Sequence, residues 1–199
     1  AKGMTVHLRD EGPEDGGEDT PVLVLLHGSN SDLHTWDKWV DRLKNDFRVI
    51  RYDQRGHGLT GAASDESYQL ESFTADLEGV AQALDLDKFI LAGNSMGGWI
   101  SAGYALEYPE RLDGLVLVDA SGPPIKNDRP PPIGFRIARM PVIRDVARHF
   151  LPRSIYERSL SQSVANQAVV TDDMVDRYWE LGRYPGNRDA TMLRFRTLR

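Results

Sequence analysis

The sequence contains no cysteine, which excludes disulfide bonds, thiolate metal sites and a cysteine nucleophile from these 199 residues. Its apolar runs are far shorter than the roughly 20 residues that a membrane-spanning helix needs. Five histidines are scattered along the chain, and no two have the H-x-x-x-H spacing of a helical zinc site. The net charge of -6 argues against a general surface for nucleic acids or anionic membranes. We therefore expect no metal ion, no nucleic-acid partner and no membrane span in this segment.

The remaining composition is ordinary for a globular protein, with 40% hydrophobic and 27% charged residues. The length fits one domain, or one domain with a small insertion. No internal repeat or low-complexity segment interrupts it. The lack of cysteine leaves the cellular compartment open, and a cytoplasmic location is our expectation; the oligomeric state cannot be predicted.

The pentapeptide Gly93-Asn94-Ser95-Met96-Gly97 is the most informative feature. It follows the apolar run 89–92 and precedes a helical pattern that includes Trp99 and Ile100. A serine between two glycines at a strand-to-helix junction is typical of a nucleophile elbow, in which a tight turn exposes the serine hydroxyl. Such a turn needs small neighbours, and glycine has no Cβ that could clash. The motif predicts Ser95 as a catalytic nucleophile, with the N–H groups of a helix start beside it.

A second segment supports this interpretation. Val22–Leu26 is a continuous apolar run, as expected for a strand buried on both faces, and His27-Gly28-Ser29-Asn30 follows it. Together with the elbow, this segment resembles the α/β-hydrolase superfamily. The resemblance implies that the backbone amides of Ser29 and Met96 form an oxyanion hole, and that no cofactor is needed. We expect His27 to brace the loop rather than to accept protons.

A third match is the segment 51–58, Arg-Tyr-Asp-Gln-Arg-Gly-His-Gly, which resembles the structural D-x-R-G-x-G turn of the same family. We therefore expect His57 to be a scaffold residue. Alternating residues in 4–9 predict a half-exposed, antiparallel edge strand, with His7 on its solvated face. Apolar stripes at helical spacing predict helices at 35–45 and from about 68 to 84. The predicted fold class is α/β, a doubly wound and mostly parallel sheet.

The pattern changes after the strand 115–118, which the resemblance numbers as the sixth. Prolines at 123–124 and 130–132 interrupt regular structure, and only helical signals follow. These signals are a stripe from Val142 to Leu151, a helix with Pro152 at its first position, a start capped by Thr171, and a helix that begins near Met192. A helical insertion at this point resembles the cap of the family. We predict a hydrolase core at 1–122 and a helical cap at 123–199.

A serine nucleophile needs a base, usually a histidine that is held by a carboxylate. In the family these residues follow the seventh and eighth strands, and both are expected after residue 199. Within the chain, His149 is a weak candidate for the base, because it lies in the helical pattern of the cap. Asp119 is a weak candidate for the acid, because its side chain could instead bond the backbone of the turn into the cap. A parallel sheet that ended at 115–118 would expose an apolar edge. We therefore expect these residues to be part of a longer hydrolase and to be inactive alone.

Three functions remain open. The leading hypothesis is a serine hydrolase that cleaves a carboxylic ester or related acyl substrate through an acyl-enzyme. The second is a C–C bond hydrolase of ring-cleavage products, whose elbow the hexapeptide 93–98 resembles, although the loop 27–32 has less glycine and proline than that group usually shows. The third is a non-catalytic, ligand-binding protein on the same fold. The natural substrate cannot be predicted.

Overall fold

The computed structural model describes residues 3–17, 19–122, 140 and 149–197. The strands in this part form one sheet, with β1 pairing antiparallel to β3 and the other strands parallel. Their order in the sheet is β1-β3-β2-β4-β5. Their bounds are β1 (Leu8–Glu11), β2 (Val22–Leu26), β3 (Arg48–Tyr52), β4 (Phe89–Asn94) and β5 (Leu112–Val118). The predicted α/β class with a mostly parallel sheet is confirmed.

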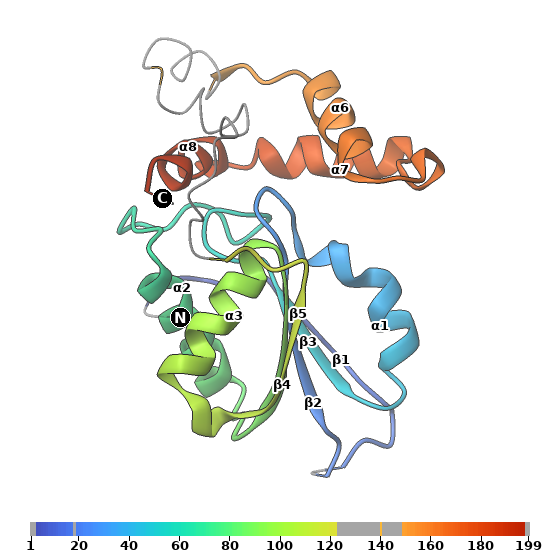
Figure 1. The fold of residues 1–199 in the computed structure, drawn as a ribbon, viewed down its shortest axis with the longest axis vertical. Helices are drawn as coiled ribbons and strands as arrows, with labels where there is room; N and C mark the ends of the chain where they lie inside the picture. The colour runs from blue at the N-terminus through green and yellow to red at the C-terminus, as the bar shows by residue number, and fades with distance from the viewer. Residues whose placement is uncertain (1–2, 18, 123–139, 141–148, 198–199) are drawn as a thin grey trace.

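Helices cover both faces of the sheet (Figure 1). Helix α1 lies on one face, and α2 and α3 lie on the other, while α6, α7 and α8 lie across one end of the sheet (Figure 1). None of the described helices is long and apolar enough to cross a bilayer. The bounds are η1 (Leu33–Trp36), α1 (Asp37–Leu43), α2 (Leu70–Ala83), α3 (Met96–Glu107), η2 (Pro109–Arg111), α6 (Arg153–Ser163), η3 (Gln167–Val169), α7 (Asp172–Gly182) and α8 (Asn187–Thr197).

Strand β2 lies in the middle of the sheet and is buried on both faces. Alternate side chains of a strand point to opposite faces, so its apolar residues serve two separate cores. Leu23 and Leu25 join the cluster that contains Trp36 and Val40, whereas Leu26 joins the larger cluster under α2 and α3. The continuous apolar run in the sequence is therefore the consequence of two helical layers, as predicted.

Helix α2 confirms the predicted stripe. Phe73, Leu77 and Val80 are buried and pack in the cluster under α2 and α3. The predicted helix at 35–45 is a 3-10 turn, η1, that continues into α1. The earlier start arises because the Asp32 carboxylate accepts a hydrogen bond from the N–H of His34 (2.8 Å) and caps the turn.

The prediction of a strand at 4–9 is wrong in its bounds, because β1 begins only at Leu8, opposite Tyr52. Its antiparallel place at the sheet edge is confirmed. His7 is only partly solvated, with 32% of its side chain exposed. Its backbone N–H donates to Thr60 Oγ1 (2.9 Å), and its Nδ1 lies 2.7 Å from a carboxylate oxygen of buried Asp53. These partners hold His7. They are distant in the sequence, so the alternation of apolar and polar residues does not reveal them.

The helices at the C-terminal side follow their predicted start signals closely. The Thr171 hydroxyl accepts from the N–H of Met174 (3.2 Å) and caps α7, as predicted. Pro152 is the N-cap of α6 rather than its first residue, and α8 begins at Asn187, before the predicted start near Met192. The stripe predicted from Val142 onward lies mostly outside the described residues. The predicted boundary between residues 122 and 123 coincides with the end of a described range. The two-part division stays a prediction.

Strand β5 forms one edge of the described sheet, and its side chains are unusually exposed. Leu115, Val116 and Leu117 are 41%, 40% and 48% exposed. The sheet that is described has five strands, so the strand numbered sixth by resemblance is the fifth here. An apolar parallel edge is normally covered in folded proteins. The apolar side chains of β5 are therefore only partly covered by the described residues.

Arg55 anchors the loop after β3 to α2 through a buried ion pair. Its Nε and Nη2 donate to both carboxylate oxygens of Asp76 (2.5 and 2.8 Å), and both residues are buried. Its Nη1 also donates to Asp65 (3.1 Å), whose side chain is 58% exposed. These carboxylates raise the pKa of Arg55 in spite of its burial, so it stays charged. Arg55 is thus held by one buried and one exposed carboxylate.

The two partners of Arg55 allow a controlled stability test. Asp76→Asn should lower the free energy of unfolding by about 3–5 kcal/mol, because it removes the buried partner of a buried cation. Asp65→Asn should cost less than about 1 kcal/mol, because solvent screens that pair. Urea unfolding of the two variants measures both. Equal losses would show that burial does not set the strength of these pairs.

Candidate active site

Ser95 joins β4 to α3 in a strained conformation. Its φ of 52° and ψ of -116° are unusual for a residue with a side chain. The flanking backbone holds this conformation: the N–H of Ser95 donates to Val118 (3.1 Å), and its carbonyl accepts from Ser121 (2.9 Å) and Trp99 (3.2 Å). The turn places Ser95 among the residues that line a pocket.

The glycines around Ser95 are required by close backbone contacts. A Cβ on Gly93 would lie 2.3 Å from the Gly97 carbonyl oxygen, and one on Gly97 would lie 2.3 Å from that of Leu26. A Cβ on Gly98 would meet the Ala120 side chain at 2.5 Å. These contacts are with backbone or short side chains that cannot move aside. The three glycines therefore allow β2, β4 and α3 to approach closely enough to form the turn.

The loop after β2 lies directly against this turn. A Cβ on Gly28 would stand 3.2 Å from the Cβ of Ser95 and 3.1 Å from Asn94 Oδ1. Ser29, the next residue, lines the same pocket, and Met96 is the first residue of α3. The first N–H groups of a helix have no acceptor within the helix, so such groups are available to a ligand. The structure thus packs the loop that contains Ser29 against the elbow that contains Ser95 and Met96, and the role of Ser29 and Met96 as oxyanion donors stays a prediction.

His27 braces the loop, as expected. Its ring is fully buried; Nδ1 donates to the Gly28 carbonyl (2.8 Å), and Nε2 accepts from the N–H of Gln54 (3.1 Å). The Gln54 side chain returns a bond to the His27 carbonyl (2.6 Å). Burial lowers the pKa of His27, more than nearby carboxylates raise it. A neutral ring with both nitrogens engaged fixes the loop and leaves no free proton acceptor.

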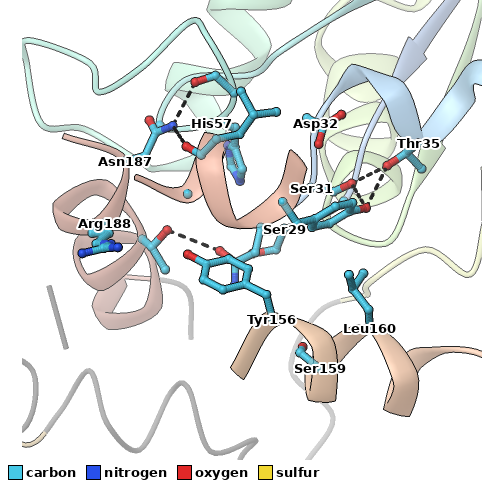
Figure 2. Close-up of a pocket in the computed structure, with 18 of the residues that line it drawn as sticks. Ser29, Ser31, Asp32, Thr35, His57, Tyr156, Ser159, Leu160, Asn187 and Arg188 are labelled. Atoms are coloured by element: carbon cyan, nitrogen blue, oxygen red, sulfur yellow. Dashed lines mark hydrogen bonds between the residues drawn. The ribbon is translucent and has the colours of Figure 1, made fainter. Parts of the chain in front are cut away.

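His57 is packed edge-on against His27, with ring centroids 4.9 Å apart. Its Nδ1 donates to the Arg55 carbonyl (2.9 Å), while its Nε2 is buried and has no hydrogen-bond partner among the described residues. Burial, followed by the positive charge of Arg194, lowers the pKa of His57 well below 6.5. His57 is therefore a neutral residue in the pocket wall (Figure 2), which agrees with the expected scaffold role.

The turn after β3 depends on Asp53. Its buried carboxylate accepts from the N–H groups of Leu33 (2.8 Å) and Leu59 (2.9 Å) and contacts His7. Gly58 has a φ of +49°, and a Cβ there would fall 2.0 Å from the Asp53 carboxylate. The residues of this turn are thus held by structural bonds, as the sequence predicts.

A pocket of about 470 Å³ opens beside Ser95. Figure 2 shows its walls: Ser29, Ser31 and His57 lie on one side, and Tyr156, Ser159 and Leu160 of α6 lie on the other. Several polar bonds join α7 and α8 to the core around it, and three of them illustrate the arrangement. They run from Tyr178 to Ser31 (2.9 Å), from Asn187 to the Gly58 carbonyl (2.9 Å) and from Arg194 to Asn30 (2.6 Å). The C-terminal helices therefore roof the pocket.

The hydrogen bonds between described residues give the Ser95 hydroxyl one side-chain neighbour, the Ser121 hydroxyl at 3.5 Å. Asp119 lies after β5, is exposed and has a φ of 45°. His149 is exposed, and its carbonyl accepts from Arg188 (2.7 Å). Neither is bonded to Ser95 in the described part of the chain. No group of three potential metal ligands occurs among the described residues.

Sequence reasoning missed the pocket residues of the C-terminal helices. Tyr178 and Asn187 stand 147 and 129 residues from their partners in the core. Only the start signals of their helices could have been read from the sequence. The bonds to the core exist because the helices fold back over the sheet.

The glycine contacts predict a large difference between two glycine substitutions in strands. Gly93→Ala should lower the free energy of unfolding by at least about 2 kcal/mol, because the new methyl would overlap backbone atoms. Gly114→Ala is the matched control: its Cβ would meet only Ile90 atoms at 3.7 Å, and we expect a change within about 1 kcal/mol. Denaturant unfolding of both variants measures this. A mild Gly93→Ala would mean that the elbow can relax.

The buried His57 predicts a pH dependence of stability. Because its folded pKa is lowered, the unfolded chain binds more protons once the pH falls below 6.5, so stability is lost as the pH falls from 6.5 toward the folded pKa. One such group contributes at most about 1.4 kcal/mol per pH unit. His57→Gln should reduce the slope between pH 7 and 5, although His27 contributes in the same direction. Urea unfolding across this range tests it, and an unchanged slope would contradict the assignment.

The comparisons with known proteins agree with this geometry. The profile of a family described as the α/β hydrolase fold matches residues 21–191. A 2-hydroxy-6-oxo-2,4-heptadienoate hydrolase of Pseudomonas putida is 32% identical over 194 residues, which are 96% of this chain and 63% of that protein. The chain thus spans less than two thirds of that relative.

Two solved structures share the fold. A meta-cleavage product hydrolase of Pseudomonas fluorescens matches with a TM-score of 0.78 and 24% identity, over 100% of this chain and 69% of its own. An esterase of Thermogutta terrifontis matches with a TM-score of 0.75 and 24% identity, over 98% of this chain and 68% of its own. At this identity the likeness concerns the fold alone. Because the family profile covers most of the chain, this protein belongs to the α/β hydrolase fold family.

Proposed function

We propose that this chain carries the nucleophile of a serine hydrolase that cleaves a carboxylic ester or related acyl substrate. The carrying observation is the strained Ser95, which stands at the junction of β4 and α3 and lines the pocket. Ser95 Oγ attacks the substrate carbonyl, the alcohol leaves with a proton, and water hydrolyses the acyl-enzyme. The product acid is released, and Ser95 is restored.

The backbone amides of Ser29 and Met96 are the proposed oxyanion donors. The contact of Gly28 with the Ser95 Cβ and the start of α3 at Met96 support this assignment. Two preorganised donors stabilise the charge that develops on the carbonyl oxygen, and loss of one such donor typically costs about 10²–10³ in turnover.

The proposed base is a histidine outside the described residues. His27 uses both ring nitrogens within the loop, and His57 is packed into the scaffold. We interpret Asp119 as a turn residue, since its carboxylate is exposed and its backbone is left-handed. We further propose that residues 1–122 form the core and 123–199 the cap, as the pocket between them suggests.

A C–C bond hydrolase of ring-cleavage products is the second candidate. The similarity to the Pseudomonas putida protein, which is named for the hydrolysis of 2-hydroxy-6-oxo-2,4-heptadienoate, extends over 96% of this chain and favours it. The esterase proposal rests on the more general chemistry of the elbow. A third possibility is a ligand-binding protein without catalysis. It differs from both enzymes because its Ser95 would not react with substrate or with a fluorophosphonate.

Ser95→Ala tests the nucleophile. In the full-length protein, hydrolysis of short p-nitrophenyl esters should fall by at least about 10⁴-fold, because no other group can form the acyl-enzyme. Folding should change little, since the hydroxyl packs against few atoms. A fluorophosphonate should label the wild type and not the variant, as measured by intact mass. Labelling at another residue, or a fully active variant, would exclude the assignment.

The same protein distinguishes the candidate functions. We expect a higher kcat/KM for short p-nitrophenyl esters than for ring-cleavage dienols. Cleavage of the dienols is measured by the loss of their absorbance. The reverse order would support the C–C hydrolase. Absence of both activities, together with no labelling, would support a non-catalytic protein.

A further inference from the structure

The pocket beside Ser95 combines apolar side chains with a set of polar groups, as small-molecule sites generally do. Hydroxyl groups are frequent in its wall and come from both the core loops and the C-terminal helices. Examples are Ser29, Ser31, Tyr156, Ser159 and Tyr178. Such a wall offers hydrogen bonds to the polar groups of a substrate, beside apolar surface from residues such as Leu151, Ile155 and Met192.

Arg188, the second residue of α8, brings a positive charge to this wall (Figure 2). Its Nη1 donates to the carbonyl of His149 (2.7 Å), and its Nε is buried without a hydrogen-bond partner among the described residues. None of the ion pairs between described residues involves Arg188. A buried guanidinium N–H without an acceptor is costly, so a ligand that supplies one would be stabilised there.

One acidic residue lines the pocket, and a second arginine lies behind its wall. Asp32 is the single acidic residue in the described lining, and its buried carboxylate bonds the N–H of His34 and lies 3.8 Å from Arg177. Arg194 is fully buried and donates to Asn30, a lining residue. Burial lowers the pKa of Arg194 to about 10, so it remains protonated at neutral pH. A chain with a net charge of -6 thus gathers cations around this pocket.

Tyr156 of α6 completes the arrangement. Burial raises the pKa of its hydroxyl, and the Arg188 guanidinium opposes that rise through its charge and a hydrogen bond. The phenol therefore stays protonated and can donate. Gly182 of α7 lies against it, since a Cβ there would be 2.1 Å from the Tyr156 hydroxyl. The position of Tyr156 beside Arg188 is thus fixed by backbone.

On the basis of the proposed hydrolysis at Ser95, we propose that this pocket selects acyl substrates that carry a second, free carboxylate, which Arg188 binds with help from the Tyr156 hydroxyl. The substrate class is monoesters of small dicarboxylic acids. A guanidinium matches a carboxylate with two parallel donors, and the charge-assisted bonds are stronger than those between neutral groups. The carboxylate is bound and not consumed.

The test compares two substrates of the full-length protein that differ in one charge. Mono-p-nitrophenyl adipate carries the free carboxylate, and p-nitrophenyl methyl adipate has it methylated. The measured quantity is the ratio of kcat/KM for the anionic over the neutral ester. We expect a ratio above one in the wild type and a fall of about ten- to a hundredfold in Arg188→Gln, as expected for a bond to a charged group.

Arg183→Gln is the matched control. Arg183 is the C-cap of α7; it is exposed, stacks on Trp179 at 4.5 Å and is not among the described residues that line the pocket. The Arg183→Gln substitution removes the same charge and should keep the ratio of kcat/KM for the two esters within about twofold of the wild-type ratio. A wild type without preference, an unchanged ratio in Arg188→Gln, or an equal fall in Arg183→Gln would overturn the proposal. If Arg188→Gln does not fold, Arg188→Lys should keep the charge but lose most of the preference.

A binding measurement separates this proposal from the proposed reaction. Calorimetry with free adipate and the Ser95→Ala protein needs no turnover. We expect binding that weakens at least tenfold when Arg188→Gln is added. Absence of binding, or equal binding in both proteins, would overturn the carboxylate site even if esters are cleaved. If neither ester is hydrolysed, the proposed reaction fails, and calorimetry alone decides the site.

Discussion

The site depends on the close approach of three backbone segments. Gly97 at the start of α3 lies against the end of β2, and Gly93 at the end of β4 lies against Gly97, with no room for a Cβ at either position. This approach forces Ser95 into its left-handed conformation and keeps it at the pocket. A strained residue persists only where its surroundings determine it, and here the hydrogen bonds to Val118 and Ser121 do so.

Buried polar residues hold the loops around this turn. His27 ties the loop after β2 to Gln54, and Asp53 ties the turn after β3 to the N–H groups of two other segments. Arg55 then joins that turn to α2 through Asp76. Each of these groups would be costly if left unpaired, so the loops are fixed more firmly than their irregular backbone suggests. A rigid loop in turn keeps Ser29 beside Ser95.

The charge distribution differs between the whole molecule and the pocket. The chain is acidic overall, whereas the helices that roof the pocket contribute Arg177, Arg188 and Arg194. Arg177 and Arg194 contact core residues, which explains part of this concentration. Arg188 lines the pocket itself and forms no ion pair with another described residue, and this is the basis for proposing a carboxylate substrate.

Local signals were sufficient for much of the fold and for the elbow. The run 22–26, the stripe of α2, the cap at Thr171 and the glycine spacing around Ser95 are patterns of neighbouring residues, so they could be read from the sequence, although the contact of Gly97 with Leu26 could not. The bonds of His7, the open Nε of Arg188 and the contact of Tyr178 with Ser31 could not be predicted. They join residues far apart in the chain, and only the folding of the helices over the sheet brings such groups within bonding distance.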